Sequence, residues 1–135
     1  MFKIIEHTAD IGIEAYGKTL EEAFGNAAKG MFSIMIGGGK IESKIVKQLE
    51  IPFDMDEEQL LVDWLSELLY IHDVEHLVFG EFDIKINDKL KAKAYGEEHN
   101  VKKHGYGMEI KAVTYHMLEV KRNEKGYVLK VLFDI

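Results

Sequence analysis

The chain contains no cysteine, one proline, one tryptophan and no long apolar run. The absence of cysteine excludes a disulfide framework and any chemistry that needs a thiolate. No apolar run approaches the roughly 18 residues that a membrane-spanning helix requires. The N-terminal residues also lack the basic segment and apolar core that together mark a signal peptide. We therefore expect a soluble, cytoplasmic protein with no membrane partner.

Basic residues are also fewer than acidic residues. The chain carries 17 Lys and Arg residues against 24 Asp and Glu residues, for a net charge of −7 over 135 residues. Nucleic-acid binding requires a basic surface that neutralises phosphates, so direct RNA binding is not expected, and a basic partner suits the charge better. The length fits a single domain over residues 1–135, and 47% apolar residues are enough for a core.

The spacing of apolar residues predicts strands grouped together with two helices among them. Thr19 and Glu22 form a capping box that begins the first helix, and the glycines at 37–39 end it. Asp56 begins a second helix that runs to about His72. Strands are expected at 2–7, 11–16, 45–51, 82–86, 90–94, 110–121 and 127–134, and a surface loop at 97–108. This order predicts an α+β fold, with a mainly antiparallel sheet and both helices packed on one face.

The segment from His7 to Gly12 places an imidazole and a carboxylate, that of Asp10, in a tight link between the first two strands. The last strand stops abruptly on Asp134 and Ile135. If the first and last strands are neighbours, Asp10, Asp134 and the terminal carboxylate of Ile135 converge. Three anionic groups repel one another unless a hard cation lies among them, and their oxygen atoms suit calcium or magnesium. Taken singly, Asp10 is typical of an Asx turn and Asp134 of a solvated acid.

A further group of polar residues lies in the strand expected at 110–121. Lys111, Val113 and Tyr115 share one face of this strand. The pattern is that of a plain edge strand. Alternatively, it brings a cation and a polar ring close to the acidic residues, where they contact phosphate or tune a carboxylate.

Three familiar kinds of site find no support. The glycines at 37–39 follow a helix, whereas a phosphate site needs a helix N-terminus. His72 and His76 are four residues apart but straddle the end of the second helix, so a histidine zinc site is not favoured. No serine lies in a nucleophile elbow, which argues against a Ser-His-Asp hydrolase.

Five segments closely resemble motifs of the archease family, in the expected order and across essentially the whole chain. They are HTADIGIEAYG at 7–17, DWLSELLY at 63–70, LKAKAYGE at 90–97, KAVTYH at 111–116 and FDI at 133–135. One departure is Tyr127, close to which many relatives carry tryptophan in the last strand. The resemblance implies a strand-helix-strand-strand core that carries an insertion.

The resemblance also implies a function. Archeases are accessory proteins, not enzymes, for the RtcB-type tRNA-splicing RNA ligase; they promote its guanylylation by GTP and let it turn over repeatedly. This chain would then meet GTP only through the ligase. The family binds a divalent cation, assigned as calcium, with magnesium or manganese as alternatives, and the matching ligands here are Asp10, Asp134 and the backbone carbonyl of Ile135. Lys111 matches a lysine of the same functional face. We expect Lys111 and His7 of the first motif to serve the interaction with the partner.

Two other interpretations stay open. The chain could be a small stand-alone metal-dependent enzyme that uses Asp10 as a base, with assistance from His7 or His116. It could also be a passive chaperone for RNA-modifying enzymes. Activation of a purified ligase would distinguish both from the accessory role.

Overall fold

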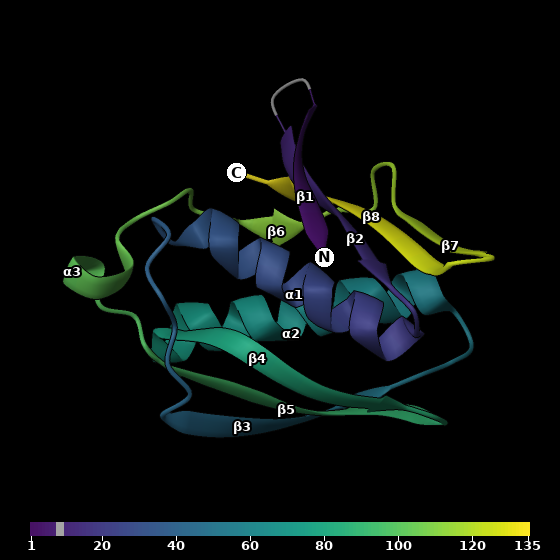
Figure 1. The fold of residues 1–135 in the computed structure, drawn as a ribbon, viewed down its shortest axis with the longest axis horizontal. Helices are drawn as coiled ribbons and strands as arrows, with labels where there is room; N and C mark the ends of the chain where they lie inside the picture. Colours follow the sequence, from purple (N-terminus) through teal and green to yellow (C-terminus); the bar gives the residue numbers. More distant parts are fainter. Residues whose placement is uncertain (8–9) are drawn as a thin grey trace.

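The computed structural model describes residues 1–7 and 10–135 and contains two antiparallel sheets with helices between them (Figure 1). The first sheet has the order β1 (Phe2–His7), β2 (Asp10–Gly17), β8 (Gly126–Asp134) and β6 (Ala112–Val113), and β7 (Glu119–Asn123) also pairs with β8. The second sheet has the order β3 (Ile45–Pro52), β5 (Lys89–Glu98) and β4 (Leu77–Ile86). All of these strand pairs are antiparallel.

The α+β class and the antiparallel pairing are confirmed, but the strands divide between two sheets instead of forming one. The reason lies in helix α1 (Leu20–Met35), of which 11 of 16 residues are buried. A helix that is apolar over so wide an arc cannot be covered by a single sheet. The helices therefore form a middle layer with one sheet on each side, rather than packing on one face of a single sheet (Figure 1).

Both predicted helix starts are confirmed. The backbone N–H of Glu22 donates to Thr19 Oγ1 at 3.1 Å at the start of α1. The N–H of Gln59 donates to Asp56 Oδ1 at 3.1 Å at the start of α2 (Glu57–Glu75). Each bond satisfies one of the backbone donors that a helix start leaves without a partner. Helix α2 continues one turn beyond the predicted end, to Glu75.

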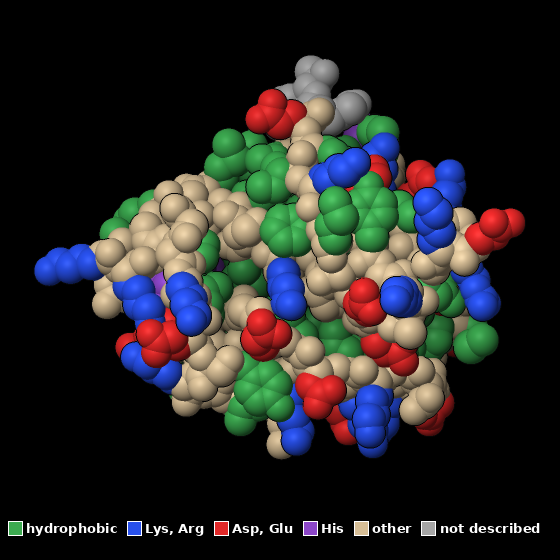
Figure 2. Space-filling model, viewed as in Figure 1, with side chains coloured by type: hydrophobic (Ala, Val, Ile, Leu, Met, Phe, Trp, Pro, Cys, Tyr) green, Lys and Arg blue, Asp and Glu red, His purple; other side chains and the backbone are tan. Residues whose placement is uncertain are grey.

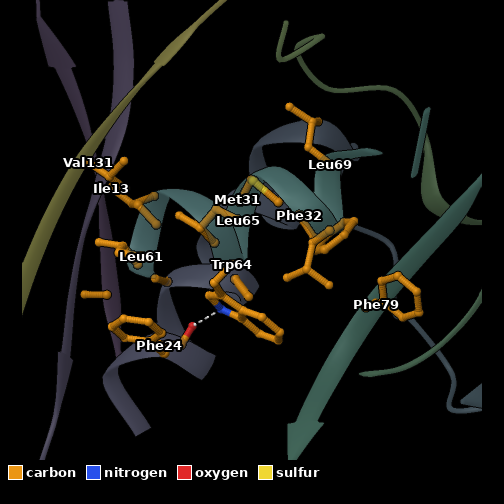
Figure 3. Close-up of a cluster of buried hydrophobic side chains, with 14 of the residues drawn as sticks. Ile13, Phe24, Met31, Phe32, Leu61, Trp64, Leu65, Leu69, Phe79 and Val131 are labelled. Carbon is orange, nitrogen blue, oxygen red and sulfur yellow. Dashed lines mark hydrogen bonds between the residues drawn. The ribbon is translucent and has the colours of Figure 1, made fainter. Parts of the chain in front are cut away.

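The core fills the space between the two sheets (Figure 3). Phe24 and Phe32 of α1 meet Trp64 of α2 there, with Phe79 of β4 on one side and Val131 of β8 on the other. Trp64 is fully buried, and its Nε1–H donates to the carbonyl oxygen of Phe24 at 3.1 Å. One apolar cluster thus connects both sheets through the helices, and it holds the strand ends of the first sheet in fixed positions.

The segment before the last strands differs most from expectation. Residues 97–108, predicted as a surface loop, contain the short helix α3 (Val101–His104), and Glu97 and His104 are buried. The strand expected at 110–121 is divided into β6 and β7 by a turn in which Met117 has a φ of 55°. A non-glycine residue in this left-handed region interrupts an extended strand.

Among the described residues, none of the helices has the length and apolar character that a membrane span requires.

Candidate functional site

The two candidate metal ligands lie at the same end of the first sheet. Asp10 is the first residue of β2, and Asp134 is the last residue of β8. The β2–β8 register pairs Ile11 with Phe133, so the next step of the ladder sets Asp10 opposite Asp134. Ile11 and Phe133 are buried in the core, and alternation therefore directs both acids to the outer face of the sheet. Opposed residues on one face have Cβ atoms about 4.5–5.5 Å apart, close enough for two carboxylates to share a cation.

The strand order that produces this arrangement differs from the one anticipated. The first and last strands are not neighbours, because β2 lies between β1 and β8 and pairs with both. The two acids still face each other because Asp10 belongs to β2 rather than to β1. His7 pairs with Asp10 across the hairpin through its backbone, whereas its side chain, Thr8 and Ala9 lie outside the described residues.

Gly12 lets β2 approach β8 closely beside the acids. It pairs with Leu132, and a Cβ atom at position 12 would overlap the backbone oxygen of Val131. Leu132 is buried although it alternates to the outer face. The glycine of the first motif therefore has a packing role, because a side chain there would separate the strands that carry Asp10 and Asp134.

Strand β6 contacts the end of β8 from the other side. The backbone N–H of Lys111 donates to the carbonyl oxygen of Asp134 at 2.7 Å, and Ala112 pairs with Asp134. Ile135 follows and is 38% exposed. By strand alternation Ala112 shares the outer face with Asp134, and Lys111 shares the opposite face with Val113. The structure thus brings the backbone of Lys111 to the acid pair, while among the ion pairs of the described residues none joins its exposed side chain to either acid.

We call Asp10, Asp134 and the carbonyl of Ile135 the acidic tip. Within the described part of the chain, no group of three or more His, Asp or Glu side chains is placed to hold a metal. The tip offers two carboxylates and a backbone carbonyl, all hard oxygen donors. Such a set fits calcium or magnesium better than zinc, and water or a partner would have to complete the shell.

The structure contains a buried ionic cluster around Glu97 that the sequence did not predict. The Glu97 carboxylate accepts hydrogen bonds from the Glu42 backbone N–H at 2.7 Å, from Lys103 Nζ at 3.0 Å and from His104 Nε2 at 3.0 Å. His104 Nδ1 accepts the backbone N–H of Asn100 at 2.9 Å, so the ring proton lies on Nε2. Lys103 also donates to Glu42 at 2.8 Å. These contacts fix α3 against the chain between α1 and β3.

The cluster shifts the pKa of Glu97 strongly. Burial raises the pKa of this carboxyl, but the hydrogen bonds from the Glu42 amide, Lys103 and His104 outweigh burial and lower the pKa to about 2. The hydrogen bonds of the folded protein therefore stabilise the ionised form of the Glu97 side chain.

We expect this shift to make stability fall in acid. The pKa of Glu97 drops from 4.5 when unfolded to about 2 when folded, so its stabilisation is full above pH 4.5 and is lost as the pH falls toward 2. The loss amounts to about 3 kcal/mol. Urea unfolding at pH 6 and pH 2.5 should show a smaller pH dependence for Glu97→Gln than for wild type. Glu98→Gln, at an exposed position, is the control and should keep the pH dependence of wild type. An equal pH dependence in wild type and Glu97→Gln would contradict the assignment of the acid-labile stabilisation to Glu97.

Comparisons with known proteins agree with these features of sequence and fold. Residues 2–135 match the Archease protein family. The chain is 47% identical to the protein archease of Pyrococcus furiosus over 126 residues, which cover 90% of this chain and 88% of that protein. It is 43% identical to the protein archease of Sulfolobus acidocaldarius over 137 residues, which cover 99% and 98% of the two chains.

Two solved structures share the fold. The solution structure of a Methanobacterium thermoautotrophicum protein has a TM-score of 0.79 at 37% identity and covers 99% of this chain and 98% of its own. The crystal structure of a Thermotoga maritima protein, described as "an archease, possible chaperone", has a TM-score of 0.69 at 26% identity and covers 98% and 96%.

Proposed function

This chain belongs to the archease family, and on that premise we propose that it is an accessory protein that activates an RtcB-type tRNA-splicing RNA ligase in the cytoplasm. It promotes guanylylation of the ligase by GTP and supports repeated turnover, and it is not itself an enzyme. GTP and RNA are handled by the ligase.

The juxtaposition of Asp10 and Asp134 on the outer face of the first sheet carries this proposal. Two like charges at directly opposed strand positions are unfavourable for the fold. Their presence at the end of the β2–β8 ladder is understandable if the pair serves a cation or a cationic partner. The ladder supplies the rigidity that such a site needs, since both residues lie at the ends of paired strands that pack on the core.

The acidic tip would hold a divalent cation, calcium in our assignment, through Asp10, Asp134 and the carbonyl of Ile135. When bound, the cation supplies positive charge that attracts phosphate oxygens. The two carboxylates would face the cationic active site of the ligase. Strand β6 and the N–H of Lys111, which precedes it, hold the end of β8 in place through their pairing with Asp134. The net charge of −7 accelerates capture of the tip by a basic cleft.

The face drawn in Figure 2 suits a protein partner better than RNA. On the face drawn in Figure 2, Lys and Arg side chains are interspersed with Asp and Glu side chains and do not gather into one basic patch. Phosphate backbones require such a patch.

Single-turnover guanylylation tests the proposal. A purified, folded RtcB-type ligase is mixed with labelled GTP, with and without equimolar protein, and the covalent ligase–GMP adduct is followed over time. We expect a higher rate with the protein present, and repeated ligation with catalytic amounts of ligase. An unchanged guanylylation rate would overturn the proposal.

A chaperone role, which the description of the Thermotoga maritima protein suggests, gives a different result. A chaperone raises the yield of folded ligase or protects it from heat, without changing the guanylylation rate of ligase that is already folded. The same assay therefore separates the two functions.

Lys111 should contribute to activation but not to metal binding. An ammonium group has no lone pair for a cation, so its targets are phosphate oxygens or an acid of the ligase. We expect Lys111→Ala to reduce the guanylylation rate about tenfold, the loss of one charged hydrogen bond. Calcium affinity should stay within a factor of about two, since the backbone bond to Asp134 does not depend on the side chain.

Two variants sharpen this measurement. Lys111→Arg keeps the charge but changes its geometry, so partial rescue is expected if the lysine contacts phosphate as a point charge. Lys125→Ala removes an exposed lysine from the β7–β8 turn and should behave as wild type. Full activation by Lys111→Ala would show that the side chain has no part in the function.

A further inference from the structure

A cavity of about 420 Å³ lies outside the acidic tip, between the ends of α1 and α2 and the segment that follows β5. Met35 lines it from α1, His72 and Asp73 line it from α2, and His76 lies just beyond α2. The other lining residues come from the chain between β5 and β6: His99, Tyr106, Gly107, Met108, Glu109 and Ile110. The C-terminal ends of both helices point toward the α3 side of the molecule (Figure 1).

The loop that forms this wall is fixed by the protein rather than loosely placed. The N–H groups of Gly107 and Met108 donate to the carbonyl oxygens of Met35 and Ile34 at 3.1 Å and 2.8 Å. A Cβ atom at position 107 would overlap the Ile34 carbonyl oxygen, so only glycine permits the approach. The ionic cluster around Glu97 holds the other end of the loop. The cavity is therefore a preformed feature of the fold.

Two of the histidines that line the cavity, His72 and His99, each have one ring nitrogen that acts as a hydrogen-bond acceptor. His72 Nδ1 lies 2.9 Å from the carbonyl oxygen of Leu77, and His99 Nε2 lies 3.0 Å from that of Gly105. A carbonyl oxygen only accepts, so these ring nitrogens carry the protons. In the neutral rings His72 Nε2 and His99 Nδ1 are then acceptors.

The charge of the cavity also favours a cation. Asp73 and Glu109 contribute carboxylates, and none of the described residues that line the cavity is Lys or Arg. The C-terminal ends of α1 and α2 add partial negative charge from their aligned peptide dipoles. Since no three His, Asp or Glu side chains among the described residues are placed to hold a metal ion, the cavity suits an organic cation better than a metal.

The walls of the cavity are aromatic and apolar as well as acidic. The rings of His99 and Tyr106 are 5.7 Å apart and nearly perpendicular. Tyr106 and Met108 are 74% and 46% exposed, and exposed apolar groups beside a polar cavity are typical of a protein interface.

We propose that this cavity binds an arginine side chain of a partner protein. A guanidinium group has five N–H donors in a plane and no acceptor, which matches a cavity lined by two carboxylates and by imidazoles with acceptor nitrogens. Its flat face can stack on an aromatic ring, and the exposed ring of Tyr106 offers one. A lysine ammonium satisfies fewer of these acceptors and stacks less well. The proposal does not depend on the acidic tip or on the ligase.

A capped tripeptide with a central arginine, acetyl-Gly-Arg-Gly-amide, tests the proposal. It is titrated into the full-length protein while the histidine and Tyr106 ring signals are followed by NMR. We expect saturable shifts of the His72, His99 and Tyr106 signals, with a dissociation constant of about 1–10 mM, as befits a single anchoring side chain. The lysine peptide should bind several-fold more weakly. The uncharged citrulline peptide should not bind.

Variants locate the site. Asp73→Asn with Glu109→Gln should weaken arginine binding about tenfold or more, because both carboxylates are lost. Glu67→Gln removes an exposed charge of α2 outside the cavity and should leave binding unchanged. Asp134→Asn should also leave it unchanged, which separates this site from the acidic tip. Equal binding of arginine and citrulline peptides, unaltered binding by the double variant, or no saturable shift would each overturn the proposal.

Discussion

Replacing Asp10 or Asp134 by alanine should abolish activation of the ligase while the protein stays folded. Each substitution removes one of the two side-chain carboxylates of the tip. Loss of a group that merely supports a metal ligand typically costs 10–100-fold in affinity, so loss of a ligand itself should cost about 100-fold or more in calcium affinity. Calcium titration calorimetry and the guanylylation assay measure the two effects separately.

The unfolding free energy provides the check on folding. Without metal, the two acids repel each other at opposed strand positions. Removing one should leave stability unchanged or raise it by up to about 1 kcal/mol. Asp88→Ala, in the exposed turn between β4 and β5, is the matched control and should retain full activation. Activation that survives both tip substitutions at saturating protein would show that the tip is not the functional surface.

The second large effect should come from Glu97→Ala. This change removes the acceptor of the Glu42 N–H, of Lys103 and of the fully buried His104 Nε2–H. Breaking a buried ionic group by deleting one partner leaves the others desolvated without compensation, and it typically costs 3–5 kcal/mol. We expect a loss of about that size in urea unfolding followed by circular dichroism.

Hydrogen exchange should locate the damage of Glu97→Ala. The Gly37 N–H donates to the carbonyl oxygen of His104 and joins the end of α1 to α3, and the His104 N–H donates to the Asn100 carbonyl at the start of α3. Protection of these two amides should fall more than that of β2 or β8. Glu98→Ala, one residue further on and exposed, should change stability by less than about 0.5 kcal/mol. Similar unfolding curves for the Glu97 and Glu98 variants would mean that the cluster has no stabilising role.

Local signals in the sequence were sufficient for the two long helices, α1 and α2, and for one hairpin. Thr19 and Asp56 act as N-caps as predicted because a capping bond spans only three residues. The apolar positions of α1 are buried as its 3.6-residue period predicts. The strands expected at 82–86 and 90–94 lie within β4 and β5, and Asn87 and Asp88, residues typical of a tight turn, form the link between them. In each case the determining contacts are close in sequence.

Non-local contacts explain what the sequence could not predict. Alternation assigns a face to each strand but does not specify its neighbour, so neither the division into two sheets nor the position of β2 between β1 and β8 could be derived. Burial of Glu97 depends on Glu42, which lies 55 residues earlier and donates through its backbone. The available signal was Asn100, a capping residue within a segment that otherwise resembles a loop. Convergence of Asp10 and Asp134 was expected from pairing of the first and last strands, which is wrong, and the two acids face each other because Asp10 begins β2 instead.

The position of β8 in the first sheet has a consequence for how the protein folds. Strand β8 pairs with β2, β6 and β7, yet it follows β2 by more than a hundred residues. The β1–β2 hairpin keeps an unpaired edge until β8 arrives, and pairing over such a sequence separation is slow because loop closure precedes any stabilising contact. An edge that stays open for long is also a point of intermolecular pairing. Docking of β8 closes that edge and sets Asp134 opposite Asp10 in the same step, so the acidic tip can form only as the sheet is completed.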